Sequence, residues 1–131
     1  MEDDPFVREG IVSLINSQAD LVCCAEAGSI AATTALVAMQ RPNLVLLDLK
    51  LQDGQAFDLI QSMQRQLPEL PVLVLTQCDE RLYAERALQA GARGYIMKEA
   101  ATDNLLSAIR MVMEGKIYLS PAMTARLLQK I

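Results

Sequence analysis

Charged and hydroxyl side chains stand at the ends of several short apolar stretches of this 131-residue chain. Three of different chemistry close such stretches: Asp48, Thr76 and Lys98. Three carboxylates lie near the first residue: Glu2, Asp3 and Asp4. A carboxylate, a hydroxyl and an ammonium group can together receive and hold a phosphoryl group, and extra carboxylates can hold a divalent cation.

Asp48 is the candidate nucleophile, because a carboxylate is already ionised at neutral pH and needs no general base. Thr76 can donate its hydroxyl to a phosphoryl oxygen, and Lys98 can pair with the same group as a positive charge. The N-terminal carboxylates offer the oxygen ligands that Mg²⁺ prefers. The chain contains no histidine, which excludes histidine-based zinc sites and a histidine general base.

The elements that must position these residues alternate along the chain. Apolar residues at helical spacing predict helices, and short continuous apolar runs predict buried strands. The predicted helices cover residues 5–17, 29–40, 55–66, 80–90 and 101–114, with a last one after Pro121. The predicted strands cover residues 21–27, 44–47, 71–76 and 94–97. Such a series folds as an α/β domain with a parallel sheet, and its ligands gather at the carboxyl ends of the strands.

Composition limits the other possibilities. Hydrophobic residues make up 52% of the chain and charged residues 21%, which is typical of a single globular domain. The net charge of −4, without a long basic stripe, disfavours direct nucleic-acid binding by this segment. No signal peptide or membrane-spanning run is recognisable, so we expect a cytoplasmic protein without membrane contact. Three cysteines, an odd number, are expected to be reduced thiols: Cys23, Cys24 and Cys78.

Four segments together resemble the receiver domain of bacterial two-component response regulators. They are the acidic pair with the first helix (2–10), the stretch around Asp48 (45–51), the stretch ending at Thr76 (72–76) and the stretch ending at Lys98 (91–98). The resemblance implies a flavodoxin-like, doubly wound parallel sheet with strand order 2-1-3-4-5. It covers essentially the whole chain.

The resemblance also implies roles. Asp48 would accept a phosphoryl group from a sensor histidine kinase, assisted by Thr76 and Lys98. Mg²⁺ would be bound by Glu2, Asp3, Asp48 and the backbone carbonyl of Lys50. Tyr95 and Thr76 would form a switch, in which Tyr95 turns inward as the hydroxyl moves. The chain would then be a phospho-acceptor that takes part in its own phosphotransfer and dephosphorylation, and not an enzyme acting on other substrates.

Two further features resemble the NarL/LuxR-type subgroup of transcription regulators. They are Lys98-Glu99-Ala100, with an acidic residue where proline is usual, and the ending Tyr118-Leu119-Ser120-Pro121. We therefore expect a receiver domain over residues 1–115 and a linker helix over 116–131. The linker would lead toward a helix-turn-helix domain, which would supply any DNA binding, and the active form would be a homodimer.

The sequence also departs from the family pattern. Only Met1 precedes Glu2, so the family's first strand is largely missing. Because that strand lies inside the sheet, its neighbours would be left with unpaired N–H and C=O groups. We expect rearranged or intermolecular strand pairing, or a slimmer sheet.

Other readings remain open at this point. Asp48 alone could be a helix cap, Lys98 a surface residue, and the acidic residues 2–4 a cap of the first helix. A pseudo-receiver, an interaction module that is not phosphorylated, would use the same fold. A haloacid-dehalogenase-like phosphatase also uses an aspartyl nucleophile, but it would require a second Asp where this chain has Lys50.

Overall fold

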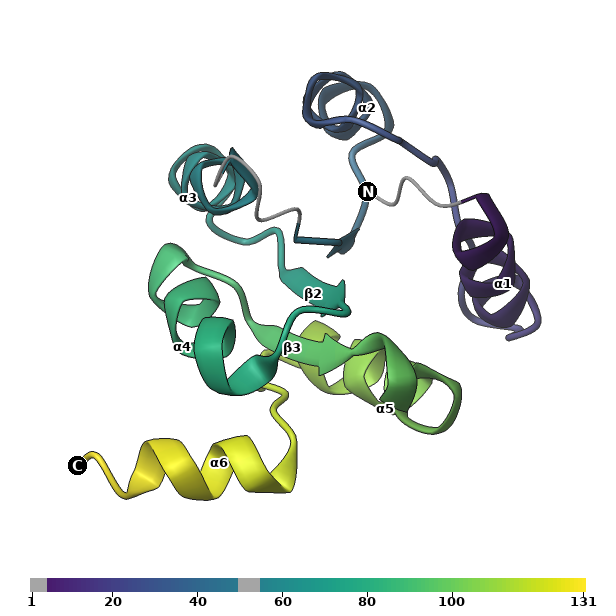
Figure 1. The fold of residues 1–131 in the computed structure, drawn as a ribbon. Coiled ribbons are helices and arrows are strands. Elements are labelled where there is room, and N and C mark those ends of the chain that lie inside the picture. The colour runs from purple at the N-terminus through teal and green to yellow at the C-terminus, as the bar shows by residue number, and fades with distance from the viewer. Residues whose placement is uncertain (1–4, 50–54) are drawn as a thin grey trace. The chain divides into compact units, whose positions relative to one another are not determined.

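The computed structural model describes residues 5–49 and 55–131, and the fold is drawn in Figure 1. The chain forms two compact units, which meet between Pro42 and Asn43 in the sequence.

The first unit contains two helices, α1 (Pro5–Asn16) and α2 (Ile30–Gln40). Ser29 caps α2, because its side-chain oxygen accepts a hydrogen bond from the backbone N–H of Ala32 at 3.1 Å. Both helices were predicted from apolar periodicity and from this cap, and both are confirmed.

The strand predicted over residues 21–27 is wrong, because these residues join no ladder in the described part of the chain. They are held by local contacts instead. The Asn16 side chain accepts a hydrogen bond from the N–H of Cys23 at 2.8 Å, and Arg8 pairs with Glu26 at 3.4 Å. An apolar run becomes a strand only beside a partner.

The second unit is built on a three-stranded parallel sheet in the order β1-β2-β3. The strands are β1 (Val45–Leu47), β2 (Val72–Thr76) and β3 (Gly94–Met97). Every residue of the central strand β2 is buried, which explains its unbroken apolar sequence. The described residues therefore form a sheet with fewer strands than the family pattern, which was one of the expected outcomes. The carboxyl ends of its three parallel strands lie at one edge.

Helices connect and cover these strands. They are α3 (Gln55–Gln66), α4 (Glu80–Ala90) and α5 (Ala101–Met113), the last preceded by the short 3₁₀ helix η1 (Lys98–Ala100). Helix α3 connects β1 to β2 and α4 connects β2 to β3, so the chain crosses the sheet in one direction. Right-handed connections therefore place α3 and α4 on the same face of the sheet. Arg86 of α4 lies over the ring of Phe57 in α3, 4.1 Å from its centre. Helices α4 and α5 lie on opposite sides of β3 (Figure 1).

The C-terminal segment returns to the sheet and ends in the predicted last helix, α6 (Pro121–Leu128). The N–H of Tyr118 donates to the carbonyl of Arg93, and the N–H of Tyr95 donates to the carbonyl of Tyr118, each at 3.0 Å. Ser120 then caps α6, accepting a hydrogen bond from the N–H of Met123 at 3.1 Å. The side chain of Met123 is buried. Helix α6 packs against α4.

Gly94 permits the close approach of this returning segment to β3. A Cβ atom at this position would lie 2.7 Å from Cδ1 of Leu73 and 3.2 Å from the carbonyl oxygen of Tyr118. We expect Gly94→Ala to lower the free energy of unfolding by ~1–3 kcal/mol through overpacking, measured by urea denaturation. Gly10→Ala is the control, because its added Cβ meets nothing within 4 Å and lies inside helix α1. Equal stability of the two variants would contradict this role for Gly94.

Across the described part of the chain, every helix is too short or too polar to cross a lipid bilayer.

Candidate functional site

Asp48 and Lys98 form an ion pair at the carboxyl edge of the sheet. Asp48 follows the last residue of β1, and Lys98 begins η1 directly after β3. The Nζ atom of Lys98 lies 2.9 Å from Oδ2 of Asp48, and the two side chains are only 14% and 10% exposed. Because both side chains are nearly buried, little water screens their charges, and the attraction between them is strengthened. The fold thus brings together two predicted site residues that are far apart in sequence.

Thr76 ends the strand that lies between the other two. It is fully buried, and its Oγ1 accepts a hydrogen bond from the N–H of Cys78 at 3.2 Å. Because β2 pairs with β1 on one side and β3 on the other, Thr76 occupies the central of the three strand ends. A carboxylate, a hydroxyl and a cation are therefore carried by three neighbouring strands.

Cys78 holds this edge together in a way that the sequence did not reveal. Its thiol lies 3.6 Å from the carbonyl oxygen of Leu49, the residue after Asp48. Its N–H donates to Thr76, and its carbonyl accepts a hydrogen bond from the hydroxyl of Tyr95 at 2.7 Å. From its residue type, Cys78 was predicted only to be a reduced thiol. Its position could have indicated its role, because Cys78 lies in the loop that follows β2 at the carboxyl edge of the sheet, where ligands are expected.

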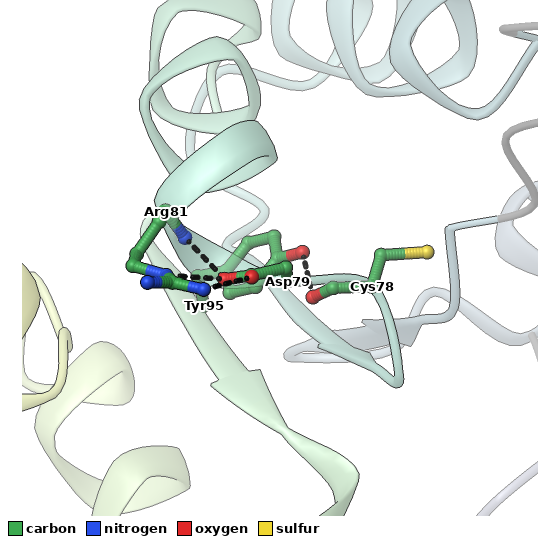
Figure 2. Close-up of polar contacts among 4 residues, drawn as sticks. All are labelled: Cys78, Asp79, Arg81 and Tyr95. Atoms are coloured by element: carbon green, nitrogen blue, oxygen red, sulfur yellow. Dashed lines mark hydrogen bonds and ion pairs between the residues drawn. The ribbon is translucent and has the colours of Figure 1, made fainter.

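Tyr95 already points inward in this structure. Its side chain comes from β3 and is only 2% exposed, and its hydroxyl reaches the Cys78 carbonyl (Figure 2). Burial raises the pKa of Tyr95 well above its usual value, and the nearby acidic groups of Cys78, Asp79, Glu80 and Asp48 raise it further. A switch in which Tyr95 turns inward stays a prediction.

Asp79 fixes the beginning of helix α4 beside the site. Its Oδ1 accepts a hydrogen bond from the N–H of Arg81 at 2.9 Å, and its Oδ2 lies 2.9 Å from the Arg81 guanidinium (Figure 2). The side-chain hydrogen bond from Arg81 lowers the pKa of Asp79 below its usual value. Both side chains are solvent-accessible, so this contact serves to set the start of the helix.

Only one of the predicted metal ligands lies in the part of the chain that the structure describes. Glu2, Asp3 and Lys50 lie outside the described residues, and Asp48 lies inside them. Within residues 5–49 and 55–131, no group of three histidine, cysteine, aspartate or glutamate side chains is arranged to hold a metal ion. Asp48 can supply one carboxylate ligand of the kind that Mg²⁺ prefers.

The raised pKa of Tyr95 predicts a specific pH dependence of stability. Above about pH 10 the unfolded chain loses the tyrosine proton while the folded chain keeps it, so the stability present at lower pH is progressively lost. We expect the free energy of unfolding of the wild type to fall by about 1 kcal/mol more than that of Tyr95→Phe between pH 9 and 11. Urea denaturation at each pH measures this difference.

The control for this experiment is Tyr83→Phe, which leaves Tyr95 and its contact with Cys78 unchanged. It is expected to keep the wild-type decline. If Tyr95→Phe declines as steeply as the wild type, the phenol of Tyr95 does not stay protonated in the fold.

Known proteins resemble this chain in sequence and in structure. A family described as the response regulator receiver domain matches residues 1–110. The chain is 32% identical over 131 residues to the DNA-binding transcriptional activator DevR/DosR of Mycobacterium tuberculosis, covering 100% of this chain and 60% of that protein. It is 30% identical over 130 residues to the oxygen regulatory protein NreC of Staphylococcus carnosus, covering 98% and 60% respectively. The chain thus spans about 60% of the length of these curated relatives.

A solved structure agrees with these relatives. The crystal structure of a LuxR-family two-component response regulator from Aurantimonas superposes with a TM-score of 0.88 at 26% identity, covering 98% of this chain and 92% of that one. The receiver fold inferred from the four sequence segments is confirmed. With residues 1–110 matched and the relatives aligned along the whole chain, this protein belongs to the response regulator receiver domain family, and its relatives are NarL/LuxR-type regulators.

Proposed function

We propose that Asp48 accepts a phosphoryl group from the phosphohistidine of a sensor histidine kinase. The observation that carries the proposal is the nearly buried ion pair between Asp48 and Lys98 at the edge where Thr76 ends the central strand. Nucleophile, counter-charge and hydroxyl come from three neighbouring strands, which is the arrangement that phosphoryl transfer by positioning and electrostatics requires.

In the proposed transfer, a carboxylate oxygen of Asp48 forms a bond to phosphorus while the bond between phosphorus and the kinase histidine nitrogen breaks. The electron pair of the broken bond stays on that nitrogen. The aspartyl phosphate carries roughly two negative charges, by analogy with other phosphorylated side chains, whereas the free carboxylate carries one, so the site beside Lys98 becomes more negative by about one charge. Lys98 then pairs with the phosphoryl oxygens, and Thr76 donates its hydroxyl to one of them.

The ligands proposed for Mg²⁺ are Glu2, Asp3, Asp48 and the backbone carbonyl of Lys50. Asp48, the one within the described residues, offers a donor that suits this ion. Bound Mg²⁺ would neutralise part of the phosphoryl charge. Calorimetric titration with MgCl₂ checks the assignment, since Asp48→Asn is expected to weaken binding.

The proposed output is a change in association. New contacts of the phosphoryl group with Lys98 and Thr76 would favour one packing of α4, β3 and α5 over another, and so shift the population between them. We propose residues 1–115 as the receiver and 116–131 as a linker. Homodimer formation, and control of a following DNA-binding domain, would then result from this shift. The relative DevR/DosR is described as a DNA-binding transcriptional activator.

Incubation of the chain with a small phosphodonor and MgCl₂ tests the proposal. We expect the intact mass to increase by one phosphoryl group, and peptide mapping to place the group on Asp48. No increase in mass, with either the phosphodonor or a phosphorylated kinase, would favour the alternative of a pseudo-receiver. A pseudo-receiver would use the same fold as an interaction module without phosphorylation.

A further inference from the structure

Helix α6 is held on α4 by side-chain contacts at both of its ends. The hydroxyl of Ser120 donates a hydrogen bond to Oε2 of Glu80 at 2.6 Å, and Lys130 pairs with Glu85. Between these contacts Met123 is only 2% exposed. Acidic groups of α4 thus meet donors from the C-terminal segment around a buried apolar anchor.

Glu80, the first residue of α4, belongs to a short segment that also contacts the candidate site. We call residues 78–80, which run from the loop after β2 into this first helical residue, the connecting loop. At one end, the carbonyl of Cys78 accepts the Tyr95 hydroxyl and its N–H donates to Thr76. At the other end, Glu80 accepts the hydrogen bond from Ser120. Three consecutive residues therefore contact the strand-end site on one side and the N-terminus of α6 on the other.

Charge also links the connecting loop to α6. The pKa of Asp79 is lowered chiefly by its hydrogen bond from Arg81, with a smaller contribution from Arg126 of α6. A shift of the loop would therefore change both its short contact with Ser120 and its attraction to Arg126.

We propose that the connecting loop couples the strand-end site to helix α6. The hydrogen bond from the Tyr95 hydroxyl to the Cys78 carbonyl then determines how stably α6 packs on α4. Glu80 and Ser120 are the positioning residues of this coupling. Since coupling between two sites is reciprocal, release of α6 would also loosen the hold on Tyr95. This coupling does not depend on whether Asp48 is phosphorylated.

The choice of variant matters because Ser120 has two roles. It caps α6 by accepting from the N–H of Met123, and it donates to Glu80. Ser120→Ala would remove both interactions and so would weaken α6 for two reasons. Glu80→Ala removes the contact with α6 and leaves the Ser120 cap in place. Tyr95→Phe removes the hydroxyl at the other end of the connecting loop.

The test is amide hydrogen exchange of the whole chain, measured by NMR for wild type, Glu80→Ala, Tyr95→Phe and the double variant. We expect Glu80→Ala to speed exchange of the α6 amides roughly tenfold, which is the effect of losing one hydrogen bond to a charged group. Tyr95→Phe is expected to speed the same amides about three- to fivefold, the scale of one lost neutral hydrogen bond. If the loop couples the two sites, the double variant exchanges no faster than Glu80→Ala alone.

Two references separate coupling from general loss of stability. The amides of strand β2 report global unfolding, so α6 exchange is read relative to them. Glu114→Ala is the matched control, because it removes an exposed carboxylate that pairs with Lys116 and not with α4. It is expected to leave α6 exchange unchanged. Unchanged α6 exchange in Glu80→Ala, or effects of the two single changes that multiply in the double variant, would overturn the proposal.

Discussion

Asp48→Asn is expected to abolish phosphoryl incorporation while leaving the protein folded. The amide has nearly the same shape as the carboxylate and can still accept a hydrogen bond from Lys98, whose Nζ lies 2.9 Å from Oδ2 in the wild type. It has no negative charge and is a far weaker nucleophile. Incorporation from a small phosphodonor should fall by roughly a thousandfold or more, since the covalent step itself is removed.

The measurement is intact-mass spectrometry of the variant beside the wild type, with circular dichroism to verify folding. Asp58→Asn is the matched control, because it makes the same chemical change at an exposed position in the first turn of α3. It should incorporate as much as the wild type. Full incorporation in Asp48→Asn would show that another residue is the acceptor.

The helices and the placement of the site could be predicted from sequence because both depend on local or topological rules. Apolar residues at helical spacing and the capping side chains of Ser29 and Ser120 define helix positions without reference to distant parts of the chain. Parallel strands place their carboxyl ends at one edge, so side chains after successive strands were expected to converge. Asp48 and Lys98 do so.

The features that sequence reasoning missed depend on non-local partners. Residues 21–27 have the composition of a strand, but strand formation depends on a neighbour that only the folded chain can supply. Cys78 acts mainly through its main-chain N–H and carbonyl, which every non-proline residue has. The inward position of Tyr95 follows from where that carbonyl lies, and residue type does not encode it.

Lys98→Met is expected to destabilise the fold as well as to impair phosphoryl transfer. Methionine keeps most of the apolar stem of lysine but leaves the carboxylate of Asp48, whose side chain is 10% exposed, without this cation. Removing one partner of a buried pair typically costs 3–5 kcal/mol. Allowing for the residual exposure of both side chains, we expect the free energy of unfolding to fall by ~2–3 kcal/mol in urea denaturation at pH 7.

The double variant Asp48→Asn/Lys98→Met separates the loss of this ion pair from lost packing. If the cost of Lys98→Met arises because the nearly buried carboxylate has lost this cation, neutralising that carboxylate should recover ~1–2 kcal/mol of it. Lys116→Met is the control, since its partner Glu114 is 61% exposed and the loss of an exposed pair costs at most ~1 kcal/mol. A double variant less stable than Lys98→Met would show that Lys98 stabilises the fold through its packing. In the predicted case, the charge that weakens the fold when Lys98 is absent is the same charge that would make Asp48 a nucleophile, so stability and the proposed phosphoryl acceptance would depend on one ion pair.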